Sequence, residues 1–216
     1  MQQIKNIIFD FGNVLMDLDL PAADRYFQQY WGENTDTART RLMQNRVFDL
    51  YEKGGLSTEE FVEALRFAGT PALTETQVLE GWNSIFIGMP AHRFELLHEL
   101  RRKYNVFLLS NINELHERWI ADYMVREHNI SDYESRFFDG VYFSHLIRLR
   151  KPDRDIFEYI LADAELDPDE TIFFDDLEMN VEAARLTGIH AYVHPVGTEI
   201  AAHIRRILPD YQLYHG

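Results

Sequence analysis

The chain has 216 residues, a formal net charge of -15 and no cysteine. The acidic balance argues against nucleic acid or an anionic membrane as a partner, because affinity for polyphosphate depends on clustered Lys and Arg. A small phosphate ester needs only a few local cations and is not excluded. The absence of cysteine excludes disulfides, Cys-ligated zinc and a thiol nucleophile.

Hydrophobic residues make up 46% of the chain, which is enough for a substantial core in one large domain or in one domain with an insertion. The first residues lead directly into an apolar segment without the pattern of a signal peptide. No apolar run approaches the roughly 18 residues that a membrane-spanning helix requires. We therefore expect a soluble, cytoplasmic protein.

The first predicted element is a buried strand over residues 4–9, an apolar run that ends at Asp10 and Gly12. The segment that follows, residues 18–88, shows only helical patterns and no pattern of a core parallel strand. Two of its expected helices begin with the capping-box pairs Ser57 with Glu60 and Thr74 with Gln77. We expect helices over residues 20–31, 36–48, 57–67 and 74–87.

From residue 91 onward, helical and strand patterns alternate, which predicts βαβ units and a parallel sheet. We expect helices over 91–104, 112–129, 153–164, 178–187 and from about 198, and strands over 105–110, 141–144, 171–175 and 189–194. The expected fold is α/β, a three-layer Rossmann-like core with a parallel sheet and an inserted helical cap. The core would comprise residues 1–17 and 90–216, and the cap residues 18–89.

Polar side chains stand where predicted strands end or the next helices begin. They are Asp10, Ser110 with Asn111, Lys151, and the pair Asp175-Asp176 followed by Asn180. Each has an ordinary interpretation: Ser110 as a helix N-cap, Lys151 as an exposed loop lysine, and the acid pair as first-turn acids. The joint order favours a site, because parallel strands bring their carboxyl ends to one edge of the sheet.

Such a set could perform phosphoryl transfer. Asp10 would be a carboxylate nucleophile that forms an aspartyl-phosphate, and Asp175 and Asp176 would hold Mg²⁺ through oxygen ligands. Ser110 and nearby backbone N–H groups would bind phosphate oxygens at the start of the next helix. Lys151 would neutralise charge on the transferring group.

The set resembles the haloacid dehalogenase-like superfamily of hydrolases over the whole chain. Its four motifs match, in order, residues 4–15, 108–111, 150–152 and 173–188. Within the superfamily, the motifs look most like those of small sugar phosphatases acting on glucose 1-phosphate. The resemblance implies that Asp10 is the nucleophile and also a ligand of Mg²⁺. It implies that the other ligands of Mg²⁺ are the carbonyl oxygen of Gly12 and the carboxylates of Asp175 and Asp176. The phosphate would be held by Ser110, Asn111 and Lys151, and Asn180 would orient the acid pair or a metal-bound water.

The chain departs from the pattern at Gly12, where most phosphatases of the superfamily carry a second Asp as general acid and base. General acid–base help is worth roughly 10²–10⁴-fold, so a leaving group that needs little protonation, a cap residue or an ordered water would have to compensate. Asp17 and Asp19 are possible substitutes, although solvated linker acids are the simpler interpretation. Residues 51–53 of the cap are a possible substrate-facing loop.

The expected function is a Mg²⁺-dependent phosphatase for a small phosphorylated metabolite such as a sugar phosphate. One alternative is a 2-haloacid dehalogenase, in which Asp10 attacks carbon without a metal; such relatives also lack the second Asp. A second alternative is a catalytically weak protein that binds a phosphorylated ligand. The substrate and the oligomeric state stay open.

Overall fold

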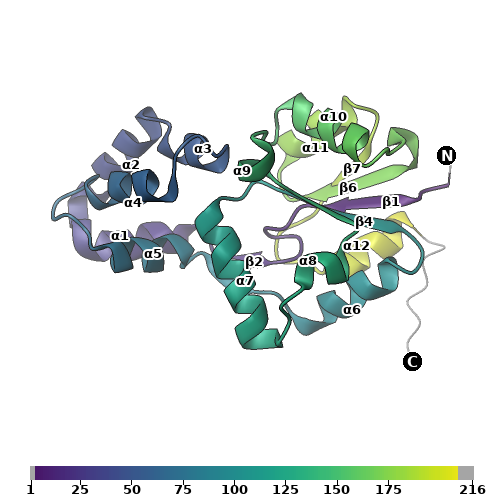
Figure 1. Ribbon diagram of the computed structural model, residues 1–216, viewed down its shortest axis with the longest axis horizontal. Helices are drawn as coiled ribbons and strands as arrows, with labels where there is room; N and C mark the ends of the chain where they lie inside the picture. The colour runs from purple at the N-terminus through teal and green to yellow at the C-terminus, as the bar shows by residue number, and fades with distance from the viewer. Residues whose placement is uncertain (1–2, 209–216) are drawn as a thin grey trace.

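The computed structural model describes residues 3–208, which form a central five-stranded parallel sheet with helices on both faces (Figure 1). The strand order is β5-β4-β1-β6-β7, so β1 lies in the middle and pairs with β4 on one side and β6 on the other. The chain order reverses direction at β1, and such a switch point opens a crevice at the carboxyl ends of the strands. The strands are β1 (Asn6–Phe9), β4 (Asn105–Ser110), β5 (Gly140–Phe143), β6 (Thr171–Asp175) and β7 (His190–Val193).

Alternation of side chains along the strands creates two separate cores. Ile7 and Phe9 of β1 point into one core, whereas Ile8 points into the other. This arrangement gives the three layers predicted from the sequence. The first core is covered by α6 (Ala91–Leu100), α7 (Glu114–His128), α8 (Tyr133–Phe137) and α12 (Ile200–Ile207), and the second by α10 (Arg154–Asp163) and α11 (Glu178–Arg185).

Between β1 and β4 the chain forms a helical unit with its own hydrophobic cluster, to which Leu115 of α7 also contributes. The unit lies to one side of the sheet, at the end where the carboxyl ends of the strands lie (Figure 1). The proposed division into a core of residues 1–17 and 90–216 and a cap of residues 18–89 stays a prediction, and residues 1–2 and 209–216 lie outside the described part of the chain. The unit comprises α1 (Pro21–Trp31), η1 (Gly32–Asn34), α2 (Thr35–Gln44), α3 (Val47–Glu52), α4 (Thr58–Arg66) and α5 (Glu75–Asn83).

The helix expected over residues 36–48 is divided in two by Arg46, which adopts a left-handed conformation with φ of 54°. Leu42 before the break and Val47 after it are both buried in the cluster of the helical unit. Five residues apart on one continuous helix, these side chains would point in different directions. The turn at Arg46 brings both into the same core. Both capping boxes predicted for α4 and α5 are present.

The sequence patterns missed several short elements. The helix expected over residues 74–87 ends at Asn83, and β3 (Phe86–Gly88) follows it and pairs antiparallel with β2 (Asp17–Leu18). These strands lie where the chain leaves the sheet domain and where it returns. The other missed elements are η1, α8, α9 (Ser144–Ile147) and η2 (Pro168–Glu170). Within residues 3–208, none of the helices has the length and apolar character needed to cross a bilayer.

A buried arginine stabilises the region where the chain passes between the sheet and the helical unit. Arg93, near the start of α6, is 4% exposed and donates to the backbone oxygen of Leu15 at 3.0 Å and to Asp17 Oδ1 at 2.7 Å. It also donates to Glu199 Oε1, next to α12, at 3.2 Å. Asp17 is therefore committed to an ion pair, which weakens its case as a substitute general acid.

Candidate active site

The predicted convergence of polar groups takes place at the carboxyl edge of the sheet. Lys151 Nζ donates to Asp10 Oδ1 and to Asp175 Oδ2, each at 2.7 Å, and to the backbone oxygen of Leu109 at 2.9 Å. The Lys151 side chain is 2% exposed, so its interpretation as an exposed loop lysine is wrong. Burial disfavours its charge, but the carboxylates of Asp10 and Asp175 outweigh burial and raise the pKa of Lys151 above its ordinary value.

Asp175 is fully buried, and protein groups surround both of its carboxylate oxygens. Oδ1 accepts from the backbone N–H of Leu177 and from Asn180 Nδ2, both at 2.9 Å. Oδ2 accepts from Lys151 and, at 3.1 Å, from the same Asn180 amide. The structure thus places Asn180, on the first turn of α11, against Asp175 of the acid pair.

Asp176 is held by a residue whose contact the sequence analysis missed. Asn13 Nδ2 donates to Asp176 Oδ2 at 2.9 Å, and Asn13 Oδ1 accepts from the backbone N–H of Leu18 in β2 at 3.3 Å. Asn13 has a φ of 55°, a left-handed conformation in which Asn is enriched among non-glycine residues. The sequence could have indicated Asn13 as a candidate, because it stands next to Gly12 in the turn after a strand. Its partner Asp176 could not be inferred from that pattern, because it lies 163 positions away.

The position of the missing general acid is filled by an apolar side chain. A Cβ atom placed on Gly12 would lie 2.7 Å from Leu18 Cδ1, closer than real Cβ contacts come. An acidic side chain at this position would require Leu18 to move. Asp19, the other substitute considered from the sequence, accepts from Arg25 Nη1 at 3.2 Å on the exposed side of the segment.

Ser110 is 4% exposed at the end of β4, and its interpretation as the N-cap of the next helix is wrong because Asn113 caps α7. Asn111 clasps the backbone of Lys151: Nδ2 donates to the Lys151 oxygen at 2.8 Å, and the Lys151 N–H donates to Asn111 Oδ1 at 2.9 Å. This clasp positions the lysine. The direct contacts of Ser110 and Asn111 with phosphate stay predictions.

Three carboxylates, those of Asp10, Asp175 and Asp176, each offer an oxygen within 4.8 Å of the others. Burial, together with the charge of Asp175, raises the pKa of Asp10 to about 7, although Lys151 opposes both effects. Burial likewise raises the pKa of Asp176, against the hydrogen bond from Asn13. Three carboxylates around a single lysine leave excess negative charge, and carboxylate oxygens are the ligands that Mg²⁺ prefers. The residues present therefore fit Mg²⁺.

A doubly flanked parallel sheet with a buried lysine between strand-end carboxylates defines an α/β enzyme with a carboxylate-based active site. Residues 4–188 match a family model described as haloacid dehalogenase-like hydrolase, and the chain belongs to this family. The predicted superfamily and the predicted α/β fold are thereby confirmed.

Two Bacteroides thetaiotaomicron comparisons cover most of the chain. D-ribitol-5-phosphate phosphatase is 29% identical over 191 residues, 88% of this chain and 91% of the relative. A wild-type HAD family enzyme, solved in complex with magnesium and inorganic phosphate, is 31% identical with a TM-score of 0.82 over 94% of this chain and 100% of its own. An L-2-haloacid dehalogenase of Xanthobacter autotrophicus shares the fold alone, at 16% identity with a TM-score of 0.59 over 95% of this chain and 83% of its own.

Proposed function

We propose that the protein is a Mg²⁺-dependent phosphatase that hydrolyses a small phosphorylated metabolite, a sugar phosphate in particular, through an aspartyl-phosphate on Asp10. The observation that carries this proposal is the Lys151 ammonium held between Asp10 and Asp175, with Asp176 beside them. The relative named as a ribitol-phosphate phosphatase and the neighbour solved with magnesium and phosphate support this substrate class and cofactor. The closer placement near glucose 1-phosphatases stays a prediction.

In the first half-reaction, Asp10 attacks phosphorus with Oδ2, because Oδ1 is engaged by Lys151. The bond from Oδ2 to phosphorus forms as the bond from phosphorus to the leaving oxygen breaks, and the leaving alkoxide takes its proton from water. Lys151 compensates the charge that gathers on the phosphoryl oxygens. Ser110 and the backbone N–H groups after it hold those oxygens.

The residues that would hold Mg²⁺ directly are Asp10, Asp176 and the carbonyl group of Gly12. Asp175, whose two oxygens already accept four hydrogen bonds, would position Lys151. Mg²⁺, when bound, supplies electrostatic stabilisation of the transferring phosphoryl group.

In the second half-reaction, water attacks the phosphorus of the aspartyl-phosphate, the bond from phosphorus to Oδ2 breaks, and inorganic phosphate leaves with the carboxylate of Asp10 regenerated. The surplus proton of the water passes to phosphate or solvent, since Gly12 offers no acid–base side chain and Leu18 fills the adjacent space. The helical unit would act as a cap that limits the entry of water while the intermediate forms.

The test is phosphate release from a panel of sugar phosphates, sugar-alcohol phosphates, nucleotides and an aryl phosphate, with Mg²⁺ or with EDTA. We expect Mg²⁺-dependent release that falls by on the order of 10³-fold or more in Asp10→Asn, as for other lost nucleophiles. Release no greater than that of Asp10→Asn for every ester would overturn the proposal.

The absent acid at Gly12 also suits the dehalogenase alternative, which 2-chloropropionate tests directly. Chloride release that persists in EDTA would favour that reaction. Binding of inorganic phosphate without turnover of any ester would favour the non-catalytic alternative.

A further inference from the structure

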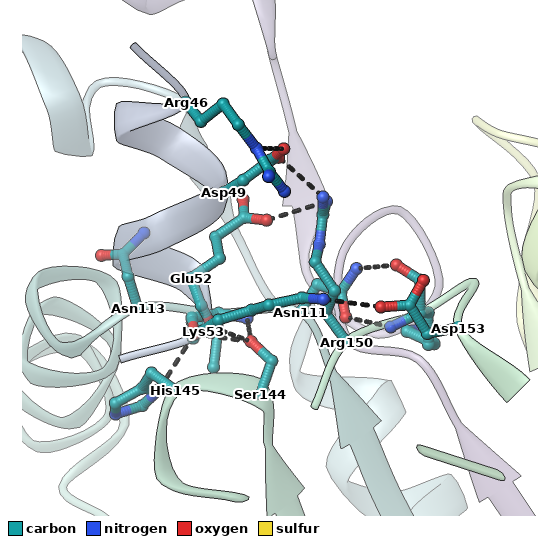
Figure 2. A network of polar contacts seen from close by, with 12 residues as sticks. Arg46, Asp49, Glu52, Lys53, Asn111, Asn113, Ser144, His145, Arg150 and Asp153 are labelled. Atoms are coloured by element: carbon teal, nitrogen blue, oxygen red, sulfur yellow. Dashed lines mark hydrogen bonds and ion pairs between the residues drawn. The ribbon is translucent and has the colours of Figure 1, made fainter. Parts of the chain in front are cut away.

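The carboxyl-terminal end of α3, in the helical unit, lies against the loop that carries Lys151 (Figure 2). Charged pairs join the two segments on both sides of the lysine. On the α3 side the partners are exposed to between a quarter and a half, so solvent reaches them. The pairs join Arg150 Nη1 to Asp49 Oδ1 at 2.7 Å, Arg150 Nη2 to Glu52 Oε2 at 2.9 Å, and Lys53 Nζ to Asp153 Oδ2 at 2.6 Å.

The signs of these charges alternate in a way that selects one docking position. The Lys151 loop presents a cation at Arg150 and an anion at Asp153, and α3 presents the opposite order, with Glu52 followed by Lys53. A shift of α3 by one residue would move like charges toward each other. Charge patterns of this kind fix register and orientation more than they add affinity.

An uncharged contact links the same segments through the backbone. Ser144 is fully buried. Its hydroxyl group donates to the backbone oxygen of Glu52 at 2.7 Å (Figure 2), and the hydroxyl oxygen accepts from the N–H of Ile112 at 3.0 Å. A single hydroxyl group therefore connects the end of α3 to the loop that follows Ser110. Gly54 comes close as well, since a Cβ atom there would clash with the backbone oxygen of His145.

Arg150 is the central residue of this contact between α3 and the Lys151 loop. Its Nε is buried and has no hydrogen-bond partner within the described chain. Leaving a buried donor unpaired is unfavourable, and the two carboxylates of α3 offset that cost only while α3 is docked. Undocking would let the guanidinium hydrate and would free the loop that precedes Lys151.

We propose that Arg150 is a positioning residue that couples the docking of α3 to the placement of Lys151, and that this coupling weakens as ionic strength rises. With α3 docked, the Lys151 loop is held from Arg150 and Asp153 as well as through the Asn111 clasp. With α3 undocked, the attachments through Arg150 and Asp153 are lost, and the loop keeps the clasp and the contacts of the buried ammonium. The catalytic part of this inference rests on the proposed phosphatase function, whereas the docking part does not.

The first readout is amide hydrogen exchange, measured by mass spectrometry on peptides spanning residues 47–56, with peptides of β4 as an internal reference. The test variant is Arg150→Gln. The matched control is Arg46→Gln, which removes the same charge from an exposed arginine that approaches Asp49 only within the helical unit, at 3.8 Å. Both are measured at about 0.05 M and about 0.5 M NaCl, which shortens the screening length severalfold.

We expect exchange over residues 47–56 to speed up about three- to tenfold in Arg150→Gln at low salt, a range typical of coupled, partly exposed pairs. The wild-type protein should approach this rate at high salt, and Arg150→Gln should keep only the smaller salt response of the Lys53–Asp153 pair. Arg46→Gln should stay within about twofold of wild type. Ser144→Ala should loosen the same peptides and keep the salt response, because it removes an uncharged contact.

The second readout is the steady-state rate with p-nitrophenyl phosphate. We expect kcat of Arg150→Gln to fall about three- to tenfold at low salt with KM less affected, and the wild-type kcat to fall toward it at high salt.

Unchanged exchange over residues 47–56 in Arg150→Gln would overturn the docking proposal, and so would equal acceleration in β4, which would make Arg150 a general contributor to fold stability. Faster exchange with an unchanged kcat would overturn the coupling to Lys151. A protein inactive toward every ester would refute the phosphatase, while hydrogen exchange would still decide whether Arg150 docks α3.

Discussion

Asn13→Gly tests whether the amide of Asn13 holds Asp176 ready for Mg²⁺. The substitution removes the hydrogen bond to Asp176 Oδ2 and the one from Leu18 N–H. Glycine adopts the observed φ of 55° without strain, so the turn after Asp10 should persist. Any loss therefore belongs to the side chain and not to the backbone.

The expected magnitude follows from the chemistry of the bond. A hydrogen bond to a charged group contributes about 1.5–3 kcal/mol net, and about 1.4 kcal/mol corresponds to a factor of ten in affinity. Mg²⁺ should therefore bind about 10- to 100-fold more weakly to Asn13→Gly. This range agrees with the effect of removing a partner that orients a metal ligand.

The assay is calorimetric titration of Mg²⁺ into the protein without substrate, so that it does not depend on turnover. Asn129→Gly is the matched control, because Asn129 also has a φ of 55° but lies at the end of α7. The control should bind Mg²⁺ like the wild-type protein. Equal Mg²⁺ affinity in Asn13→Gly and wild type would refute the reasoning, provided that Asp176→Asn abolishes binding.

Two further predictions concern the same edge of the sheet. Gly12→Asp, combined with Leu18→Ala to make room for the carboxylate, should release phosphate from a primary alkyl phosphate up to about 10²-fold faster than Leu18→Ala alone. Equal rates in the two variants would contradict the inference that an acid is missing at this position. Burial raises the pKa of Asp10 from 3.8 to about 7, so this carboxyl group is protonated below neutrality. The affinity for Mg²⁺ should therefore fall as pH falls through about 7, and Mg²⁺ binding should release protons. The same raised pKa makes the metal-free protein lose stability as pH rises from about 4 to 7. Titrations at pH 6 and pH 8 in buffers of different ionisation enthalpy measure both the affinity and the proton release, and a pH-independent affinity would be inconsistent with this.

Local patterns in the sequence were sufficient for the sheet and for the principal groups at its edge. An apolar run that ends at a polar residue marks both the strand and its carboxyl end, and parallel pairing then brings those ends together. Asp10, Ser110 and Asp175 could be expected near one another for that reason. The pattern of residues 171–175 even gave the bounds of β6.

Other features were decided only by the tertiary structure. The division of α2 from α3 depends on which faces of the two helices the rest of the helical unit covers. The helical periodicity of the sequence alone predicts one continuous helix there. The pairing of β2 with β3 joins two short segments that periodicity cannot distinguish from loop and helix end. Such elements are stabilised by partners outside their own segment, so their patterns are weak.

The contacts that position the site depend on the same long-range geometry. Asn111 holds the Lys151 backbone across 40 positions, and Asn13 reaches Asp176 across 163. The sequence by itself determined which chemical groups stand at the edge of the sheet, because strand ends are local features. Only the folded chain decided which of these groups contact one another and that Leu18 fills the space beside Gly12, because those contacts depend on turns and packing between distant segments.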